Sequence, residues 1–176
     1  MTKVTSIEGS IRINASAGTV FRLMTDADVL LKVCPGVQRF WLEGDEPYGV
    51  GSSIAFEMKK PLPGSTYGLT GILMFRAAGV KPTPGPVLRI RVTEYELNKR
   101  LAYEAKHNDH LVMGSRDIIE TAGGVELHST VSIAWSNPTA GFLKAPFFRL
   151  FGRMKDAAEL RRLKKICEAA ERQRTP

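Results

Sequence analysis

The pattern of hydrophobic and polar positions changes along this chain and predicts two kinds of segment. From residue 37 to residue 135, apolar and polar residues alternate in stretches at about 37–44, 49–59, 66–78, 86–96, 99–107, 110–120 and 124–135. A period of two residues is typical of strands that bury one face. Turn-forming residues such as Pro63-Gly64, Asn98 and Gly123-Gly124 separate the stretches. The pattern therefore predicts a meander of antiparallel hairpins.

The segment before this meander predicts one strand and two short helices. Residues 3–13 alternate, as in a strand, and are followed by short apolar segments at 17–24 and 27–33. Ser16 and Asp26 precede these two segments, and both are residue types that cap helix N-termini. The second helix is expected to end at Cys34-Pro35-Gly36, because proline disfavours a helical conformation in the residue before it.

The C-terminal segment predicts a long helix. From Gly141 onward apolar residues recur at helical spacing, which indicates one long helix or two abutting ones. The apolar stripe of 143–151 points in a different direction from that of 157–170, so we expect a bend or register break near Gly152. A helix of this length cannot bury its apolar face alone. The predicted fold is α+β, with a curved antiparallel sheet of seven or eight strands wrapped round the C-terminal helix.

Length and composition favour one domain, covering 1–176. The chain has 43% hydrophobic residues and no linker-like segment between two periodic regions. No apolar run has the length of a signal peptide or of a membrane span, so we expect a cytoplasmic protein. Cys34 and Cys167 are too few for a disulfide framework and lack the spacing of metal ligands. We therefore expect no metal and no cofactor.

The net charge of +7 is concentrated in the C-terminal helix. Residues 142–176 contain ten Lys or Arg and four Asp or Glu, which leaves +6 in that segment. Such a helix could present a solvated outer face, or it could contact a membrane surface or a protein partner. The strands lack the interleaved basic and aromatic residues of a nucleic-acid stacking platform, so we expect no nucleic-acid partner.

Several local segments, together with the order of elements, resemble a known superfamily. These segments are Ile11-Arg12-Ile13-Asn14-Ala15-Ser16-Ala17, Val20-Phe21, Asp26, Cys34-Pro35-Gly36-Val37 and Gly123-Gly124-Val125-Glu126-Leu127. They resemble the START-like helix-grip superfamily (SRPBCC) and its polyketide cyclase/dehydrase-like branch, although Val125 stands where a Thr is common. The resemblance implies a ligand cavity between the sheet and the long helix. It extends over nearly the whole chain and indicates the fold more than an activity.

Strand parity selects the side chains that would face this cavity. The inward set is clear for strands 49–59, 99–107 and 124–135. In strand 110–120 the set with Met113, Ser115 and Asp117 competes with the set Val112, Gly114, Arg116 and Ile118, and parity leaves both open. The ligand-binding residues that we predict are Phe56, Met58, Tyr103, Met113, Ser115, Ser129, Trp135, Phe147, Phe151 and Met154. A completely filled core would use the same residues.

Three of the residues in these strands are candidates for catalysis. Asp117 or His107 could act as a general acid or base, with Tyr103 as a hydrogen-bond donor, as cyclisation or dehydration would require. A buried Asp117 could instead form an ion pair with Arg89, Arg91 or Arg116. His107 and His110 flank a predicted turn, and a polar turn explains them better than a metal site does. Whether the chain is an enzyme stays open at this point.

The sequence thus favours a domain that binds a small hydrophobic ligand, with polyketide cyclase/dehydrase-like chemistry as one form of that function. The alternative is a non-enzymatic lipid carrier, or an accessory or maturation protein, that docks through its basic C-terminal helix. The apolar stretch 142–153 contains Phe147 and Phe148 and could be a gate, a membrane contact or a subunit interface. Packing of this stretch against the two short helices is the other explanation.

Overall fold

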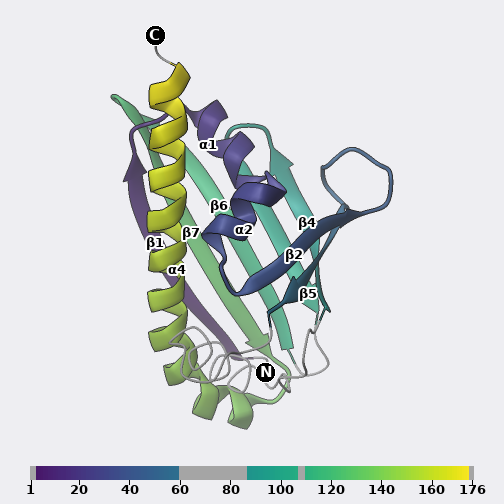
Figure 1. The fold of residues 1–176 in the computed structure, drawn as a ribbon. Helices are drawn as coiled ribbons and strands as arrows, with labels where there is room; N and C mark the ends of the chain where they lie inside the picture. Colours follow the sequence, from purple (N-terminus) through teal and green to yellow (C-terminus); the bar gives the residue numbers. More distant parts are fainter. Residues whose placement is uncertain (1–2, 60–86, 107–109, 175–176) are drawn as a thin grey trace.

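The computed structural model describes residues 3–59, 87–106 and 110–174. Within these ranges the chain forms an antiparallel sheet of seven strands in the order β1-β7-β6-β5-β4-β3-β2. The elements, in chain order, are β1 (Lys3–Ile13), α1 (Ala17–Met24), α2 (Ala27–Val33), β2 (Val37–Glu43), β3 (Ser53–Met58), β4 (Val87–Glu96), β5 (Arg100–Lys106), β6 (His110–Thr121), β7 (Gly124–Trp135) and α4 (Pro138–Arg174). Figure 1 shows α4 running along one face of the sheet, with α1 and α2 beside it.

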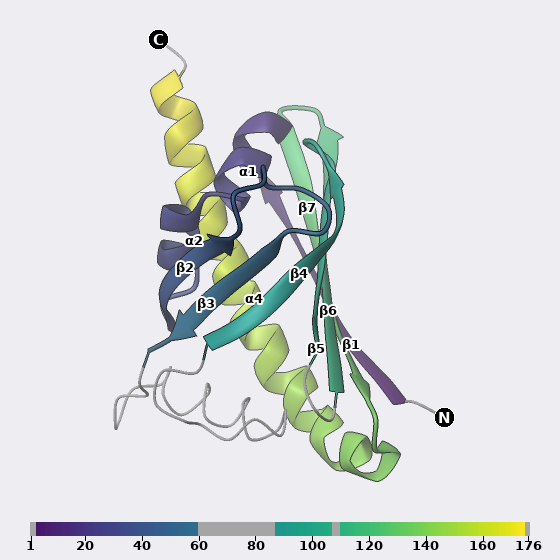
Figure 2. The same ribbon diagram turned by 90° about the vertical axis from the view of Figure 1, so that its right-hand side faces the viewer.

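The arrangement confirms the predicted helix-grip fold. The strands from β2 to β7 follow one another as a meander, while β1 pairs with β7 from the opposite end of the chain. Figure 2 shows the sheet twisting around α4, so that one face is covered by helices. We call this covered side the inner face. The predicted strand at 66–78 lies outside the described residues.

The core forms where the C-terminal half of α4 meets the inner face. Leu160, Leu163 and Cys167 belong to one buried cluster with Leu127 of β7 and Phe21 of α1. Each fully buried side chain of this size contributes about 1.5–3 kcal/mol. This cluster therefore attaches α4, α1 and the sheet to one another.

The two short helices begin where the sequence predicts. Asp26 accepts hydrogen bonds from the backbone N–H groups of Asp28 (2.9 Å) and Val29 (3.0 Å). Ser16 Oγ accepts a longer hydrogen bond from Thr19 N (3.4 Å). These bonds satisfy backbone donors that a helix leaves unpaired in its first turn, so both predicted N-caps are confirmed.

Helix α4 differs from the expectation near Gly152, because it continues through this residue as a single helix. Gly152 faces the sheet, and a Cβ atom there would lie 2.9 Å from Ile7 Cδ1, so this glycine permits close packing on β1. Pro146 also lies inside the helix, where it removes one backbone hydrogen bond. The change in direction of the apolar stripe is therefore not caused by a bend. It arises because several apolar residues before Gly152 point away from the sheet. None of the described helices is long and apolar enough to cross a membrane.

Candidate ligand-binding site

The pairing of β5, β6 and β7 determines which side chains point toward α4. Arg116 lies opposite Ser129, and Tyr103 lies opposite Gly114. Residues that pair directly across two antiparallel strands project from the same face of the sheet. Ser129 donates a hydrogen bond to Asp156 of α4 (2.7 Å), so Arg116 and Ser129 are on the inner face. The open question of parity in β6 is thereby answered in favour of Val112, Gly114, Arg116 and Ile118.

A buried ion pair connects β6 to α4. Arg116 Nη2 donates to Asp156 Oδ1 (3.0 Å), and Arg116 Nη1 donates to Ser129 Oγ. The two charged side chains are only 14% and 7% exposed. Burial disfavours the charge of Arg116, yet the nearby Tyr103, Asp156 and Glu159 raise the pKa of the guanidinium above its ordinary value. The charged pair is therefore maintained within an apolar surrounding.

Asp156 comes close to β1 because β1 has a glycine at this point. Gly9 pairs with Ser129, and a Cβ atom at Gly9 would lie 2.8 Å from Asp156 Oδ2. Any larger residue would push the carboxylate away from Arg116. The local sequence of β1 thus contributes to the site through the absence of a side chain.

A second ion pair lies within α4 and joins two residues one turn apart. Lys155 Nζ and Glu159 Oε1 are 2.6 Å apart, and the two side chains are 47% and 10% exposed. Burial disfavours the charge of Lys155, but Glu159 and Cys34 outweigh it and raise the pKa of the ammonium group. Because 47% of the Lys155 side chain is exposed, its ammonium group is accessible to another molecule while it is paired with Glu159.

Cys34 and Tyr103 complete the group. Cys34 follows α2, and its burial together with the nearby Glu159 raises the pKa of the thiol to about 12. Burial also raises the pKa of Tyr103. The Tyr103 ring lies against Gly114, where a Cβ atom would be 2.6 Å from Tyr103 Cε2. Both side chains therefore stay protonated at neutral pH and can donate hydrogen bonds.

We call Cys34, Tyr103, Arg116, Lys155, Asp156 and Glu159 the polar cluster. Apolar inner-face residues surround it: Val92 pairs with Tyr103, Leu101 with Arg116, and Val131 with Gly114. Such a site offers an apolar surface together with a few hydrogen-bond donors and acceptors. That combination is typical of pockets that orient an otherwise hydrophobic small molecule.

Among the residues predicted from the sequence, Tyr103 and Ser129 lie at this site. Phe56 is partly buried and contacts Phe40 of β2, with 5.6 Å between ring centroids, and Met58 pairs with Val37. Trp135 is buried at the far end of β7 in a second cluster with Phe148. Its ring lies beside that of His110, tilted by 37° with 5.4 Å between centroids, and Lys144 Nζ is 5.2 Å from the centre of the Trp135 ring.

Other predicted residues lie elsewhere. Met113, Ser115 and Asp117 have the opposite parity in β6 and project from the outer face, because Arg116 points toward α4. There Asp117 pairs with Arg100 and accepts a hydrogen bond from Ser115 (3.3 Å). Phe147 and Met154 are exposed on α4 and Phe151 is partly exposed. His107 lies outside the described residues, so its catalytic role stays a prediction. The catalytic role of Asp117 also stays a prediction.

Of the six residues in the polar cluster, the sequence analysis selected only Tyr103 as a site residue and missed Cys34, Arg116, Lys155, Asp156 and Glu159. A signal for one of them exists in the sequence. Asp156 stands four residues before Leu160 and seven before Leu163, so it occupies the sheet-facing stripe of α4. A carboxylate in such a stripe requires a buried partner, and Arg116 supplies it.

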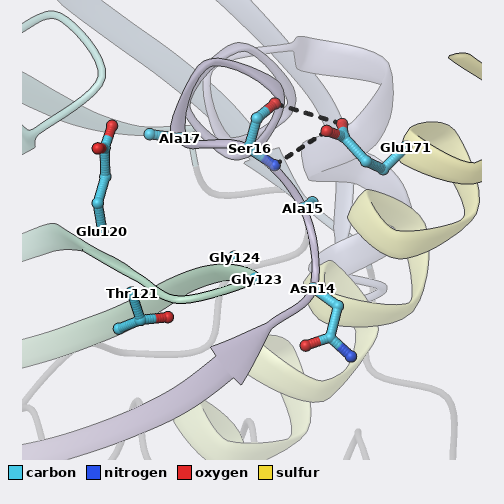
Figure 3. A pocket seen from close by; sticks show the side chains of 9 residues that line it. All are labelled: Asn14, Ala15, Ser16, Ala17, Glu120, Thr121, Gly123, Gly124 and Glu171. Carbon is cyan, nitrogen blue, oxygen red and sulfur yellow. Dashed lines mark hydrogen bonds between the residues drawn. The ribbon is translucent and has the colours of Figure 1, made fainter. Parts of the chain in front are cut away.

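A separate groove of about 400 Å³ lies where the β6–β7 hairpin meets the start of α1 and the end of α4. Figure 3 shows Glu171 pointing toward Ser16 among the residues that line this groove. The Glu171 carboxylate accepts hydrogen bonds from Ser16 N (3.1 Å) and Ser16 Oγ (3.3 Å). These contacts hold α4 against the N-terminus of α1, so we assign the groove a structural role.

The sequence matches the model of the family described as polyketide cyclase/dehydrase and lipid transport over residues 4–168. The chain belongs to this family. No curated protein sequence matches it significantly.

Solved structures with the same fold include three enzymes of low sequence identity. The di-domain aromatase/cyclase StfQ of steffimycin biosynthesis aligns with 13% identity and a TM-score of 0.69, covering 95% of this chain and 52% of StfQ. This chain thus spans about half the length of StfQ. The Zhui aromatase/cyclase from Streptomyces sp. R1128 aligns with 10% identity and a TM-score of 0.66, covering 94% of each chain. Norcoclaurine synthase from Thalictrum flavum, in complex with dopamine and hydroxybenzaldehyde, aligns with 14% identity and a TM-score of 0.62, covering 94% of this chain and 87% of that one.

Proposed function

We propose that this protein binds a small hydrophobic molecule between the inner face of the sheet and α4. The observation that carries the proposal is the polar cluster, in which Tyr103 and Lys155 present donors within an apolar surrounding. A core that only needed to be filled would be more stable with apolar residues at these positions. The apolar part of the ligand would contact the inner face, and an acceptor group of the ligand would approach Tyr103 and Lys155.

The relatives suggest a finer form of this function. Two of the structures with this fold are aromatase/cyclases, and a third is a synthase in complex with two aromatic compounds. By analogy we propose an aromatic or polyketide-like ligand with a carbonyl oxygen. In a cyclase or dehydrase reaction the Tyr103 hydroxyl would donate a hydrogen bond to the developing enolate oxygen. In a carrier the same hydroxyl would only orient the bound molecule.

Native mass spectrometry of freshly purified protein, followed by extraction of any small molecule that it carries, tests the proposal. We expect a hydrophobic compound, and its affinity should fall about five-fold in Tyr103→Phe, which loses one hydrogen bond of about 1 kcal/mol. Ser115→Ala on the outer face is the matched control and should bind normally. A protein that carries nothing and binds no member of a library of hydrophobic carbonyl compounds would contradict the proposal.

The same compound separates an enzyme from a carrier. Saturable binding without conversion indicates a carrier. Conversion that disappears in Tyr103→Phe while binding persists indicates an enzyme. Asp117→Asn tests the catalytic role predicted from the sequence, and we expect unchanged turnover because Asp117 projects from the outer face and pairs with Arg100.

A further inference from the structure

The N-terminal half of α4 exposes a continuous row of large apolar side chains. Leu143 is 66% exposed, Phe147 54%, Leu150 58% and Met154 58%. We call these four residues the outer stripe. They extend along roughly 16 Å of helix, since an α-helix rises about 1.5 Å per residue. Single exposed apolar residues are common on protein surfaces, but a row of four on one helix indicates a contact surface.

The position of the outer stripe on the helix excludes a role in the core. With about 100° between successive residues, its members fall within an arc of about 60°. Ala145, Phe148 and Gly152, which are buried against the sheet, lie on the opposite side of the helix. The outer stripe therefore points away from the sheet and from the polar cluster.

The charged residues in the N-terminal half of α4 all have one sign. Residues 136–155 contain four basic residues, Lys144, Arg149, Arg153 and Lys155, and no acidic residue. By their helical angles, Arg149 and Arg153 flank the stripe on one side and Lys144 flanks it on the other, whereas Lys155 lies nearer the polar cluster. Arg149 and Arg153 are exposed, so their guanidinium groups are accessible to a partner.

This charge distribution discriminates between two kinds of partner. The 4-3-4 spacing of the stripe would also suit a helix of a second copy, as in a coiled coil. In such a dimer, however, basic residues would face basic residues on both sides of the contact, and like charges oppose association. An anionic lipid surface offers the complementary arrangement, with phosphate groups beside acyl chains. Arginine side chains can reach the phosphates while the apolar stripe enters the acyl region.

We propose that the outer stripe, together with Arg149 and Arg153, is a docking surface for an anionic lipid bilayer. The N-terminal half of α4 lies parallel to the membrane plane, and the sheet remains on the side away from the lipid. The inference does not depend on the proposed ligand, because the outer stripe and the polar cluster are on different sides of α4. It would bring the binding site close to a phase in which hydrophobic molecules dissolve.

Co-sedimentation with lipid vesicles tests the docking surface. We compare vesicles of phosphatidylcholine alone with vesicles in which phosphatidylglycerol replaces about one third of the lipid, because docking to anionic lipid depends on surface charge. The wild type should bind the anionic vesicles and not the neutral ones. Phe147→Ser/Leu150→Ser should weaken binding at least ten-fold, since both side chains lose their burial in the acyl region. The matched control is Leu97→Ser/Ile119→Ser, which alters two exposed apolar residues elsewhere and should bind as the wild type does.

A second pair of variants tests the charges. Arg149→Gln/Arg153→Gln should weaken binding about five-fold per arginine, and added salt should reduce the difference from the wild type. Lys165→Gln/Arg172→Gln removes two exposed cations from the C-terminal half of α4 and is the control. Circular dichroism establishes that every variant is folded.

Three outcomes would overturn the proposal. The first is equal binding to neutral and anionic vesicles, or no binding to either. The second is an equal loss in the control variants. The third is a wild type that is dimeric without lipid and becomes monomeric in Phe147→Ser/Leu150→Ser, because the stripe would then be an interface with a second copy.

Discussion

The two halves of α4 use the same helix in opposite ways. In the C-terminal half, from 156 to 174, Leu160, Leu163 and Cys167 face the core. Its carboxylates are also directed into the fold, since Glu168 accepts a hydrogen bond from Asn14 N (3.0 Å) and Glu171 accepts one from Ser16 N (3.1 Å). In the N-terminal half, Leu143, Phe147, Leu150 and Met154 are exposed, and no carboxylate is present.

This difference indicates a division of roles within one helix. The C-terminal half obtains its position from apolar packing and from carboxylates that pair with backbone donors of the β1–α1 connection. The N-terminal half packs through a narrow row that includes Ala145, Phe148 and Gly152, which leaves its other side available for a partner. The polar cluster lies at the boundary between the halves, where Asp156 and Glu159 are buried and Lys155 pairs with Glu159.

The largest loss of stability is expected from breaking the ion pair between Arg116 of β6 and Asp156 of α4. Arg116→Met leaves Asp156 buried without its cation and should lower the free energy of unfolding by about 3–5 kcal/mol. Urea denaturation monitored by circular dichroism measures this change. Arg116→Met/Asp156→Leu removes both charges and should recover most of the loss. A single variant as stable as the wild type would mean that the pair does not attach α4 to β6.

A smaller loss of stability is expected from shortening an apolar side chain, and it should differ between the two halves of α4. Leu160→Ala creates a cavity in the core and should cost about 2–5 kcal/mol of stability, whereas Leu150→Ala in the outer stripe should change it by less than about 0.5 kcal/mol. Both substitutions remove the same atoms from the same helix, so each serves as the control of the other. Equal losses in urea denaturation would show that the N-terminal half is packed as tightly as the C-terminal half.

The smallest effect concerns the carboxylate that reaches α1. Glu171→Gln should cost about 1–2 kcal/mol, because hydrogen bonds to a charged acceptor are stronger than those to a neutral one. Hydrogen bonding by Thr19 lowers the pKa of Glu171 below its ordinary value of 4.5, and the Ser16 donors act in the same direction. A lowered pKa means that this stabilisation is complete above pH 4.5 and is lost as the pH falls through the folded-state value.

Urea denaturation at neutral and acidic pH tests both the stabilisation by Glu171 and its dependence on pH. The difference between wild type and Glu171→Gln should shrink as the pH falls below 4.5. Glu120→Gln alters an exposed carboxylate on the neighbouring hairpin and is the control. A difference that does not change with pH would contradict the assignment of the effect to the ionised carboxylate.

The sequence by itself determined most of the elements and the family of this protein. Ser16 and Asp26 cap α1 and α2 as predicted, and the strands β1 and β7 have the predicted bounds. These features depend on residues close in sequence, such as a capping oxygen and the N–H groups two or three positions later. Local patterns are therefore sufficient to predict them.

Only the tertiary structure decided which side of β6 and which side of α4 face the interior. Both parities of β6 mix apolar and polar residues, so alternation did not distinguish Asp117 from Arg116. The choice depends on the pairing of Arg116 with Ser129 and on the contact of both with Asp156, 40 residues beyond Arg116. Likewise, the apolar stripe of 143–154 has the pattern of a buried face, and its exposure depends on which side of the helix the sheet contacts. Periodicity shows that a face is apolar, but contacts between distant segments determine whether that face is buried.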